Sequence, residues 1–331
     1  MQSFEAFRYC HAVFCCMSAT AERIVSLLPS ATEMLYAIGA GDRIVGVTHE
    51  CDFPEEAKKK PVVIRSAIDM SSMTSSEIDA AVSSRLRAGL DLYVIDTNLL
   101  SELQPDLIIG QGLCEVCAAS GKLIERAIAS LPRTPRLMDL SPRSVDDILG
   151  NLIDLGAVTG REHAASVLVS SLRSRLSAVK RKTTQLGLSR RVFFMEWTDP
   201  VYCAGHWIPG MIETAGGVDR LGRKEMPSVR IPWDSVLEWN PEVIIVSSCG
   251  MSLSDMVQEA DKLTRLHSWN ELTAVRNGQV YAVDASSYFA RPGPRVVVGV
   301  ELLAHLLHPG QFTWSGPPGA FRSLSILDAI V

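Results

Sequence analysis

Two hydrophobic patterns alternate along this chain. Short apolar runs bounded by Gly, Pro or polar residues predict buried strands, whereas apolar residues spaced three and four apart predict helices. The predicted strands are residues 23–28, 43–47, 92–95, 106–109, 136–138, 191–195, 243–246 and 279–283. The predicted helices are 30–39, 72–90, 98–103, 122–130, 144–158, 209–215, 234–239, 254–264, 266–272 and 294–307. This alternation predicts an α/β fold with mostly parallel sheets.

The longest helical pattern covers Arg161–Gln185, a stretch without Pro or Gly. Its predicted buried stripe consists of Ala164, Val167, Leu168, Leu172, Leu176 and Val179. At 1.5 Å per residue this helix is roughly 37 Å long, about the span of a whole lobe. It could be one surface helix of a single domain, but the similarity of its two flanking regions favours a strut between two lobes.

Two other helices carry specific local predictions. Ser30 and Glu33 have the spacing of a capping box at the start of helix 30–39. In helix 72–90, Ile78, Val82 and Leu86 lie on one apolar stripe.

The two halves of the chain resemble each other. IGAGDRIVG at 38–46 is similar to AGGVDRLGR at 215–223, and LQPDLIIG at 103–110 is similar to WNPEVIIV at 239–246. Two matches in the same order indicate two similar lobes. The predicted divisions are a leader at 1–21, an N-terminal lobe at 22–140, linking helices at 141–187, a C-terminal lobe at 188–309 and a flexible tail at 310–331.

Composition narrows the class of protein. The 331 residues are 47% hydrophobic and 21% charged, with a net charge of −5, so nucleic acid is not expected as a partner. No apolar run approaches the ~20 residues that span a bilayer. The eight cysteines lack the spacing of a small secreted disulfide framework, which favours reduced thiols.

The N-terminus bears on location. Residues 1–21 contain a short apolar patch interrupted by His11, and Met17 is a natural start for the folded part. We interpret them as a disordered leader or a wrongly assigned start, which predicts a cytoplasmic protein. The alternative is a periplasmic or exported protein, if a signal is cleaved near Ala21.

Candidate chemistry follows the predicted strands, because ligands of open parallel sheets lie beyond the carboxyl ends of the strands. The candidate ligand-binding residues are Ser30, His49, Glu50, Cys51, Cys114, Glu115, Cys117, Glu196, Trp197, His206, Trp207, Cys249, Tyr288 and Arg291. If the two lobes face each other, both sets line one cleft.

These residue types suit a metal-bearing planar ligand, since aromatic rings pack its faces and His or Cys approaches the metal. The candidate metal ligands are His49, Cys51, Cys114, Cys117 and His206. The aromatics could instead complete the core, and a single C-x-x-C pair is weak evidence for zinc. No G-x-S-x-G, Walker A or H-E-x-x-H motif is present.

Several segments together resemble one known family. They are RIVSLLPSATEMLYAIGAGDRIVGVTHECDFP, LQPDLIIG, GMIETAGGVDRLG, WNPEVIIV and RPGPRVVVGVELLAHLLHP, within about residues 22–309. They are similar to the helical-backbone metal receptors, the substrate-binding proteins of ABC importers for cobalamin, haem and iron siderophores, and look closest to the cobalamin branch. The resemblance implies a class III substrate-binding-protein fold: two Rossmann-like lobes bridged by one long helix, with little hinge closure. It also implies an ABC permease partner and favours a monomer.

The leading hypothesis is a binding protein, not an enzyme, for a corrinoid (cobalamin or cobinamide) or a similar metal chelate. His49, Trp197, His206, Trp207 and Tyr288 would contact the ligand, and Glu50 and Glu196 would hold its polar substituents. The alternative is a cytosolic enzyme or handler of a bound transition metal, in which Cys51, Cys114 or Cys117 is a thiolate and His49 or Glu50 a base.

Overall fold

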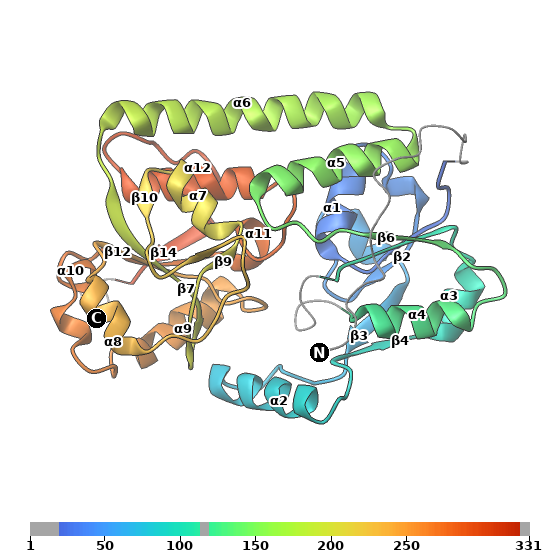
Figure 1. The fold of residues 1–331 in the computed structure, drawn as a ribbon, viewed down its shortest axis with the longest axis horizontal. Helices are drawn as coiled ribbons and strands as arrows, with labels where there is room; N and C mark the ends of the chain where they lie inside the picture. Colours follow the sequence, from blue (N-terminus) through green and yellow to red (C-terminus); the bar gives the residue numbers. More distant parts are fainter. Residues whose placement is uncertain (1–19, 113–118, 325–331) are drawn as a thin grey trace, which may run out of the picture.

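The computed structural model describes residues 20–112 and 119–324, and these form two α/β lobes (Figure 1). The first sheet has the strand order β4-β3-β2-β1-β5-β6. Its strands are β1 (Ile24–Ser26), β2 (Ile44–Thr48), β3 (Val62–Ser66), β4 (Tyr93–Ile95), β5 (Leu107–Gly110) and β6 (Arg136–Asp139). All pair in parallel except β4, which runs antiparallel to β3. The helices of this lobe are α1 (Pro29–Ala37), α2 (Ser75–Arg87), α3 (Thr97–Leu103) and α4 (Gly121–Ala129).

The second sheet has the order β10-β7-β12-β13-β14, with β8 beside β7. Its strands are β7 (Arg190–Thr198), β8 (Val201–Cys203), β10 (Gly217–Val218), β12 (Val243–Val246), β13 (Val280–Val283) and β14 (Phe321–Ser323). A small sheet pairs β9 (Gly205–His206) with β11 (Arg223–Lys224). The helices are α7 (Ile208–Thr214), α8 (Trp233–Trp239), α9 (Leu253–Leu263), α10 (Thr273–Arg276), α11 (Ala285–Tyr288) and α12 (Val296–Leu307).

The predicted strut is present. Helix α6 (Glu162–Leu186) runs along both lobes, and α5 (Val145–Thr159) leads into it from the first lobe (Figure 1). Its buried residues are Ala165, Val169, Leu172, Val179 and Thr183, spaced three, four or seven apart. Of the predicted stripe, Leu172 and Val179 are buried, Ala164, Leu168 and Leu176 pack against the same hydrophobic cluster, and only Val167 is exposed; Ala165 and Val169 are buried in addition. The fold class expected from the sequence is confirmed.

One hydrophobic cluster joins the lobes. It includes Met34 of α1, Leu152 of α5, Leu172 of α6 and Leu303 of α12, and we term it the joint cluster. Each lobe has a further cluster of its own; that of the second lobe is built around Phe193 and Trp269 and is termed the outer cluster. Continuous apolar packing beneath α5 and α6 therefore fixes the lobes to each other on that side.

The internal similarity of the two lobes extends to their hydrogen bonds. Arg23 Nε donates to Leu103 O at the end of α3, and Arg191 Nε donates to Asn240 O at the end of α8. The residues before the two prolines, Gln104 and Asn240, both have positive φ, 43° and 45°. Each lobe therefore contains the same motif, in which a helix ends at a residue with positive φ and is followed by a proline and a strand.

Four local predictions were wrong or incomplete. Pro29 occupies the first turn of α1, so Ser30 is inside the helix and makes no cap; the expected capping box is absent there. Strand β3 was missed, and the helix expected at 266–272 is only a 3-10 turn at Trp269–Glu271. The flexible tail was wrong for 321–323, which form β14 against β13.

Helix α2 is present as predicted, and it packs on the other lobe. Thr74 and Glu77 form a capping box at its start. Ile78 packs on the outer cluster of the second lobe, and Leu86 is exposed. The apolar stripe of α2 therefore contacts the second lobe through Ile78 and not the core of the lobe to which α2 belongs.

Candidate functional site

A cavity of about 100 Å³ lies where the carboxyl ends of β5 and β12 approach the loop after α11. Its lining residues are Gln111, Phe194, Glu196, Gly205, His206, Trp207, Ile208, Ser228, Ser247, Cys249, Phe289, Ala290 and Pro292. Gln111 comes from the first lobe and the others from the second, so the cavity lies between the lobes. We term it the cleft cavity.

His206 is the most distinctive group in the cleft cavity. Its backbone has a φ of 50° and is held by the bond from its N–H to Met226 O, at 2.7 Å. The ring stacks on Trp207 at 5.6 Å between centroids, and Nε2 is buried without a hydrogen-bond partner among the described residues. Burial, and then the positive charge of Arg143, lower the pKa of His206. The imidazole is therefore neutral at pH 7, with a ring nitrogen free to meet a ligand.

The backbone beside His206 approaches its neighbours closely. A Cβ on Gly205 would lie 2.3 Å from Ser228 N, so only glycine fits. The Gly205 N–H donates to Glu196 Oε1 at 2.8 Å. Glu196 is thereby held at the cavity wall, where its carboxylate both positions the β9 backbone and presents negative charge.

Aromatic rings form the apolar wall. Trp207 is buried and its Nε1–H donates to Phe289 O at 2.8 Å. Phe289 in turn contacts Phe194, with 5.3 Å between ring centroids. These contacts fix the rings before any ligand arrives, which lowers the ordering cost of binding.

Three polar residues of the cavity, Gln111, Ser228 and Ser247, were missed by the sequence prediction. Ser247 follows β12, is buried and has an unpartnered hydroxyl among the described residues, and Gln111 follows β5 and is buried. Their position directly after a strand was the available signal. Buried polar atoms normally have a hydrogen-bond partner, so the orphaned atoms of His206 and Ser247 indicate a place for a ligand or water.

Of the predicted residues, Glu196, His206, Trp207 and Cys249 line the cavity. Cys249 is exposed. Cys114, Glu115 and Cys117 lie outside the described residues.

Other predicted residues of the first lobe lie away from the cavity lining. Ser30 is buried within α1, and the Cys51 thiol is buried 3.1 Å from Thr32 Oγ1. Burial raises the pKa of the Cys51 thiol, which disfavours a thiolate. His49 is exposed, with Nδ1 3.2 Å from Ile64 O, and Glu50 is half-buried.

The remaining predicted residues of the second lobe make structural contacts. Tyr288 is buried in the joint cluster. Arg291 forms an ion pair with Asp52 of the first lobe. Burial alone would lower the pKa of Arg291, but the hydrogen bond and the charge of Asp52 raise it. The Trp197 Nε1–H donates to Ser75 O, again across the lobes, at 3.2 Å.

The described residues lack two further features. Residues 20–112 and 119–324 contain no group of three or more His, Cys, Asp or Glu side chains that could hold a metal ion. Over the same ranges, no helix has the length and apolar character needed to cross a membrane.

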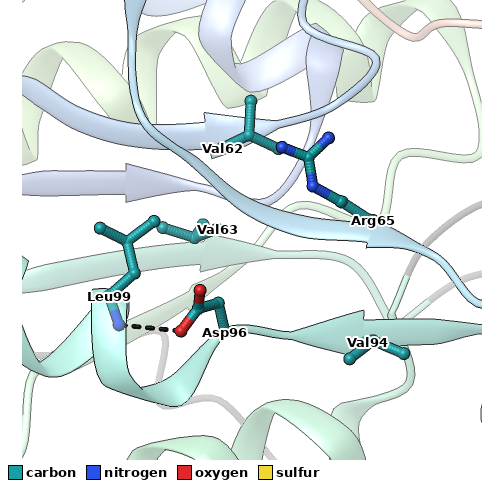
Figure 2. A pocket seen from close by; sticks show the side chains of 6 residues that line it. All are labelled: Val62, Val63, Arg65, Val94, Asp96 and Leu99. Atoms are coloured by element: carbon teal, nitrogen blue, oxygen red, sulfur yellow. Dashed lines mark hydrogen bonds between the residues drawn. The ribbon is translucent and has the colours of Figure 1, made fainter.

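A larger groove of about 540 Å³ lies along β3 and β4 (Figure 2). Its residues are Val62, Val63, Arg65, Val94, Asp96 and Leu99. The hydrogen bond drawn there, from Leu99 N to Asp96 Oδ1 at 2.9 Å, is the N-cap of α3. The groove is open, belongs to one lobe, and lacks the orphaned polar atoms of the cleft cavity, so we do not assign it as the site.

Known proteins resemble this chain over most of its length. The family model described as periplasmic binding protein matches residues 24–286. An uncharacterized ABC transporter substrate-binding lipoprotein of Bacillus subtilis is 26% identical over 302 residues, covering 88% of this chain and 81% of the relative. A vitamin B12-binding protein of Vibrio cholerae is 26% identical over 296 residues, covering 88% and 91%.

A solved structure shares the fold. The periplasmic haem-binding protein from Pseudomonas aeruginosa superimposes with a TM-score of 0.70 at 16% identity, covering 92% of this chain and 99% of that one. The cytoplasmic location expected from the sequence is wrong, because the chain matches the family model of periplasmic binding proteins and its Bacillus subtilis relative is a lipoprotein, and both kinds of protein are exported.

Proposed function

The chain belongs to the periplasmic binding protein family, and we propose that its cleft cavity binds a corrinoid, or a related metal chelate, for delivery to an ABC importer. Relatives that span most of the chain include a vitamin B12-binding protein and an ABC transporter substrate-binding lipoprotein. A protein with the same fold binds haem, so we propose the ligand class as planar metal chelates in general and not corrinoids alone.

The observation that carries the proposal is the pairing of fixed aromatic rings with orphaned polar atoms in one inter-lobe cavity. Phe194, Trp207 and Phe289 offer apolar surface. His206 Nε2 and the Ser247 hydroxyl offer buried polar atoms without partners among the described residues. A flat macrocycle with polar substituents and a metal would satisfy both kinds of surface.

The neutral state of His206 fits this role. A metal is bound by the unprotonated imidazole nitrogen, and a pKa below the ordinary value of about 6.5 keeps that form populated at neutral pH. We therefore assign His206, rather than the exposed His49, as the residue that approaches the metal of the ligand.

The thiol-dependent alternative has less support. The Cys51 thiol is buried, hydrogen-bonded with Thr32 and has a raised pKa, so it is neither a ready nucleophile nor a ready metal ligand. Cys249 borders the cavity but no second thiol of the described residues lines it.

Titration of the full chain with cobalamin, cobinamide and hemin, followed by visible absorption and calorimetry, tests the proposal. We expect one ligand to bind with 1:1 stoichiometry and a shifted visible spectrum. Absence of binding by all three would overturn the proposal, and tight binding of hemin alone would move the ligand from corrinoid to haem.

A further inference from the structure

Helix α2 belongs to the first lobe but is anchored on the second. In Figure 1 it lies apart from the first sheet, on the side of the molecule opposite α6. At its start, Ser75 Oγ donates to Glu259 Oε2 of α9 at 2.6 Å, and Glu259 also accepts from Thr198 Oγ1 at 3.1 Å. The Trp197 indole donates to Ser75 O. The first turn of α2 is thus bound to the second lobe.

The middle of α2 makes a charged contact with the same lobe. Arg230 Nη2 lies 2.6 Å from Asp79 Oδ2 and also donates to Ser83 Oγ at 3.3 Å. Tyr202 links the pair: its hydroxyl accepts from Arg230 Nε at 3.0 Å and donates to Asp79 Oδ1 at 3.3 Å. Asp79, Tyr202 and Arg230 therefore form a closed network, which we term the latch.

The apolar contact of α2 is also with the second lobe. Ile78, between Ser75 and Asp79, packs on the outer cluster of the second lobe. No α2 residue packs in the joint cluster or in the first-lobe cluster built around Ile108. Detachment of α2 from the second lobe would therefore disturb little of the apolar packing of the first lobe.

The contacts across the lobes differ in burial. On the α6 side, Glu33 and Arg295 pair with side chains only 5% and 19% exposed. In the latch, Arg230 is 52% exposed and Asp79 is 17% exposed. Water competes for the exposed pair and screens it, so the latch is the weaker of the two connections. Beside α2 this exposed pair acts together with one buried hydrogen bond, Ser75 to Glu259, whereas the α6 side has the buried ion pair and the joint cluster.

The cleft cavity is small for a metal chelate. Its volume of about 100 Å³ is well below the roughly 300–1,000 Å³ typical of small-molecule sites. We infer that α2 is a strap held by the latch, and that this strap must detach from the second lobe for ligand to enter or leave the cleft. The strap follows from the contacts alone; its action on corrinoid entry rests on the function proposed above.

Hydrogen exchange of the ligand-free full chain tests the strap directly. We expect Asp79→Ala and Arg230→Ala each to speed amide exchange in residues 75–87 by about fivefold or more, because local opening sets the exchange rate there. Lys224→Ala is the matched control: Lys224 is 51% exposed and pairs with Glu213 inside the second lobe. The exchanged pair, Asp79→Arg with Arg230→Asp, should restore slow exchange. Unchanged exchange in both single variants would overturn the strap.

Stopped-flow binding of cobinamide tests the effect on entry. We expect the observed rate to reach a plateau at high cobinamide, set by strap opening, and Arg230→Ala to raise that plateau about threefold or more. A rate that rises linearly and is identical in wild type and Arg230→Ala would overturn the role in entry. If cobinamide does not bind but amide exchange is faster in the latch variants, the corrinoid is rejected as the ligand and the strap is supported.

Discussion

Arg295, at the start of α12, donates from Nε to Glu33 Oε2 of α1 at 2.8 Å, across the boundary between the lobes and 262 residues along the chain. The ring of Phe53 lies 4.0 Å from the same guanidinium. Burial raises the pKa of Glu33 even though Arg295 opposes the shift. The buried Glu33 side chain therefore relies on Arg295 for compensation of its charge, and the ion pair links the lobes only while both side chains are present.

Removing one partner of this pair should destabilise the protein. Arg295→Met leaves the Glu33 carboxylate buried without its cation, and we expect the free energy of unfolding at pH 7 to fall by about 3 kcal/mol. The double variant with Glu33→Gln should recover most of that loss, since no buried charge remains. Urea unfolding of the three proteins checks this, and equal stability of the single and double variants would contradict it.

Two glycines of α5 should respond in opposite directions to alanine. A Cβ on Gly156 would lie 2.6 Å from Ala165 Cβ of α6, so Gly156→Ala should force α5 and α6 apart and lower the free energy of unfolding by about 1–3 kcal/mol. A Cβ on Gly150 meets nothing within 4 Å, and Gly150→Ala should raise it by about 1 kcal/mol through helix propensity. Thermal and urea unfolding measure both, and a stabilising Gly156→Ala would show that the helices adjust freely.

The buried carboxyl of Asp219 should make stability depend on pH. Burial raises its pKa from 3.8 to about 6, although it accepts bonds from the N–H groups of Phe194, Leu221 and Gly222. Between pH 4 and 6 the folded protein binds more protons at this group than the unfolded chain does. The stabilisation that Asp219 gives the folded state is therefore fully present below about pH 4 and is lost as the pH rises through 6. The free energy of unfolding changes by about 3 kcal/mol over this range.

The matched variant isolates this effect. Asp219→Asn does not titrate, so the wild type should lose stability relative to it as pH rises from 4 to 7. Urea midpoints across that pH range provide the measurement. Parallel pH profiles for the two proteins would exclude a raised pKa at this position.

His206 should control binding of a metal chelate and its pH dependence. Because burial lowers the pKa of His206, the neutral imidazole persists below pH 6.5, and affinity should fall only at more acidic pH. His206→Ala should weaken binding about tenfold or more and remove that acid-side fall, if the imidazole contacts the ligand. His49→Ala is the control, because His49 is exposed and outside the cavity lining. A loss confined to His49→Ala would reverse the assignment.

Local features of the chain made most of the fold predictable. Strand β12 and helix α6 are each bounded by turn residues and carry a continuous pattern, so their limits were found within one residue. The Ser30 and Glu33 spacing was misleading because Pro29 competes for the first turn and Glu33 pairs with a residue remote in sequence. Hydrophobic periodicity shows that a helix has an apolar face but not which lobe that face packs on, so the contact of Ile78 with the second lobe could not be predicted.

The candidate site was only partly predictable for a related reason. His206 and Glu196 are conspicuous residue types near strand ends, and they lie in the cleft cavity. Gln111 and Ser247 are of residue types that are mostly exposed in proteins, and their burial here could not be read from the sequence. Cys51 follows a strand as expected, yet its side chain turns into the core toward Thr32.

Strand β14 gives the second sheet a vulnerable margin. Its three residues cover the outer edge of β13, pairing Phe321 with Val283 and Ser323 with Tyr281. An expression tag or truncation that dislodges residues 321–323 would expose a row of unpaired peptide groups on β13, which is a template for edge-to-edge aggregation. Solubility during purification therefore depends on a short segment far from the cleft.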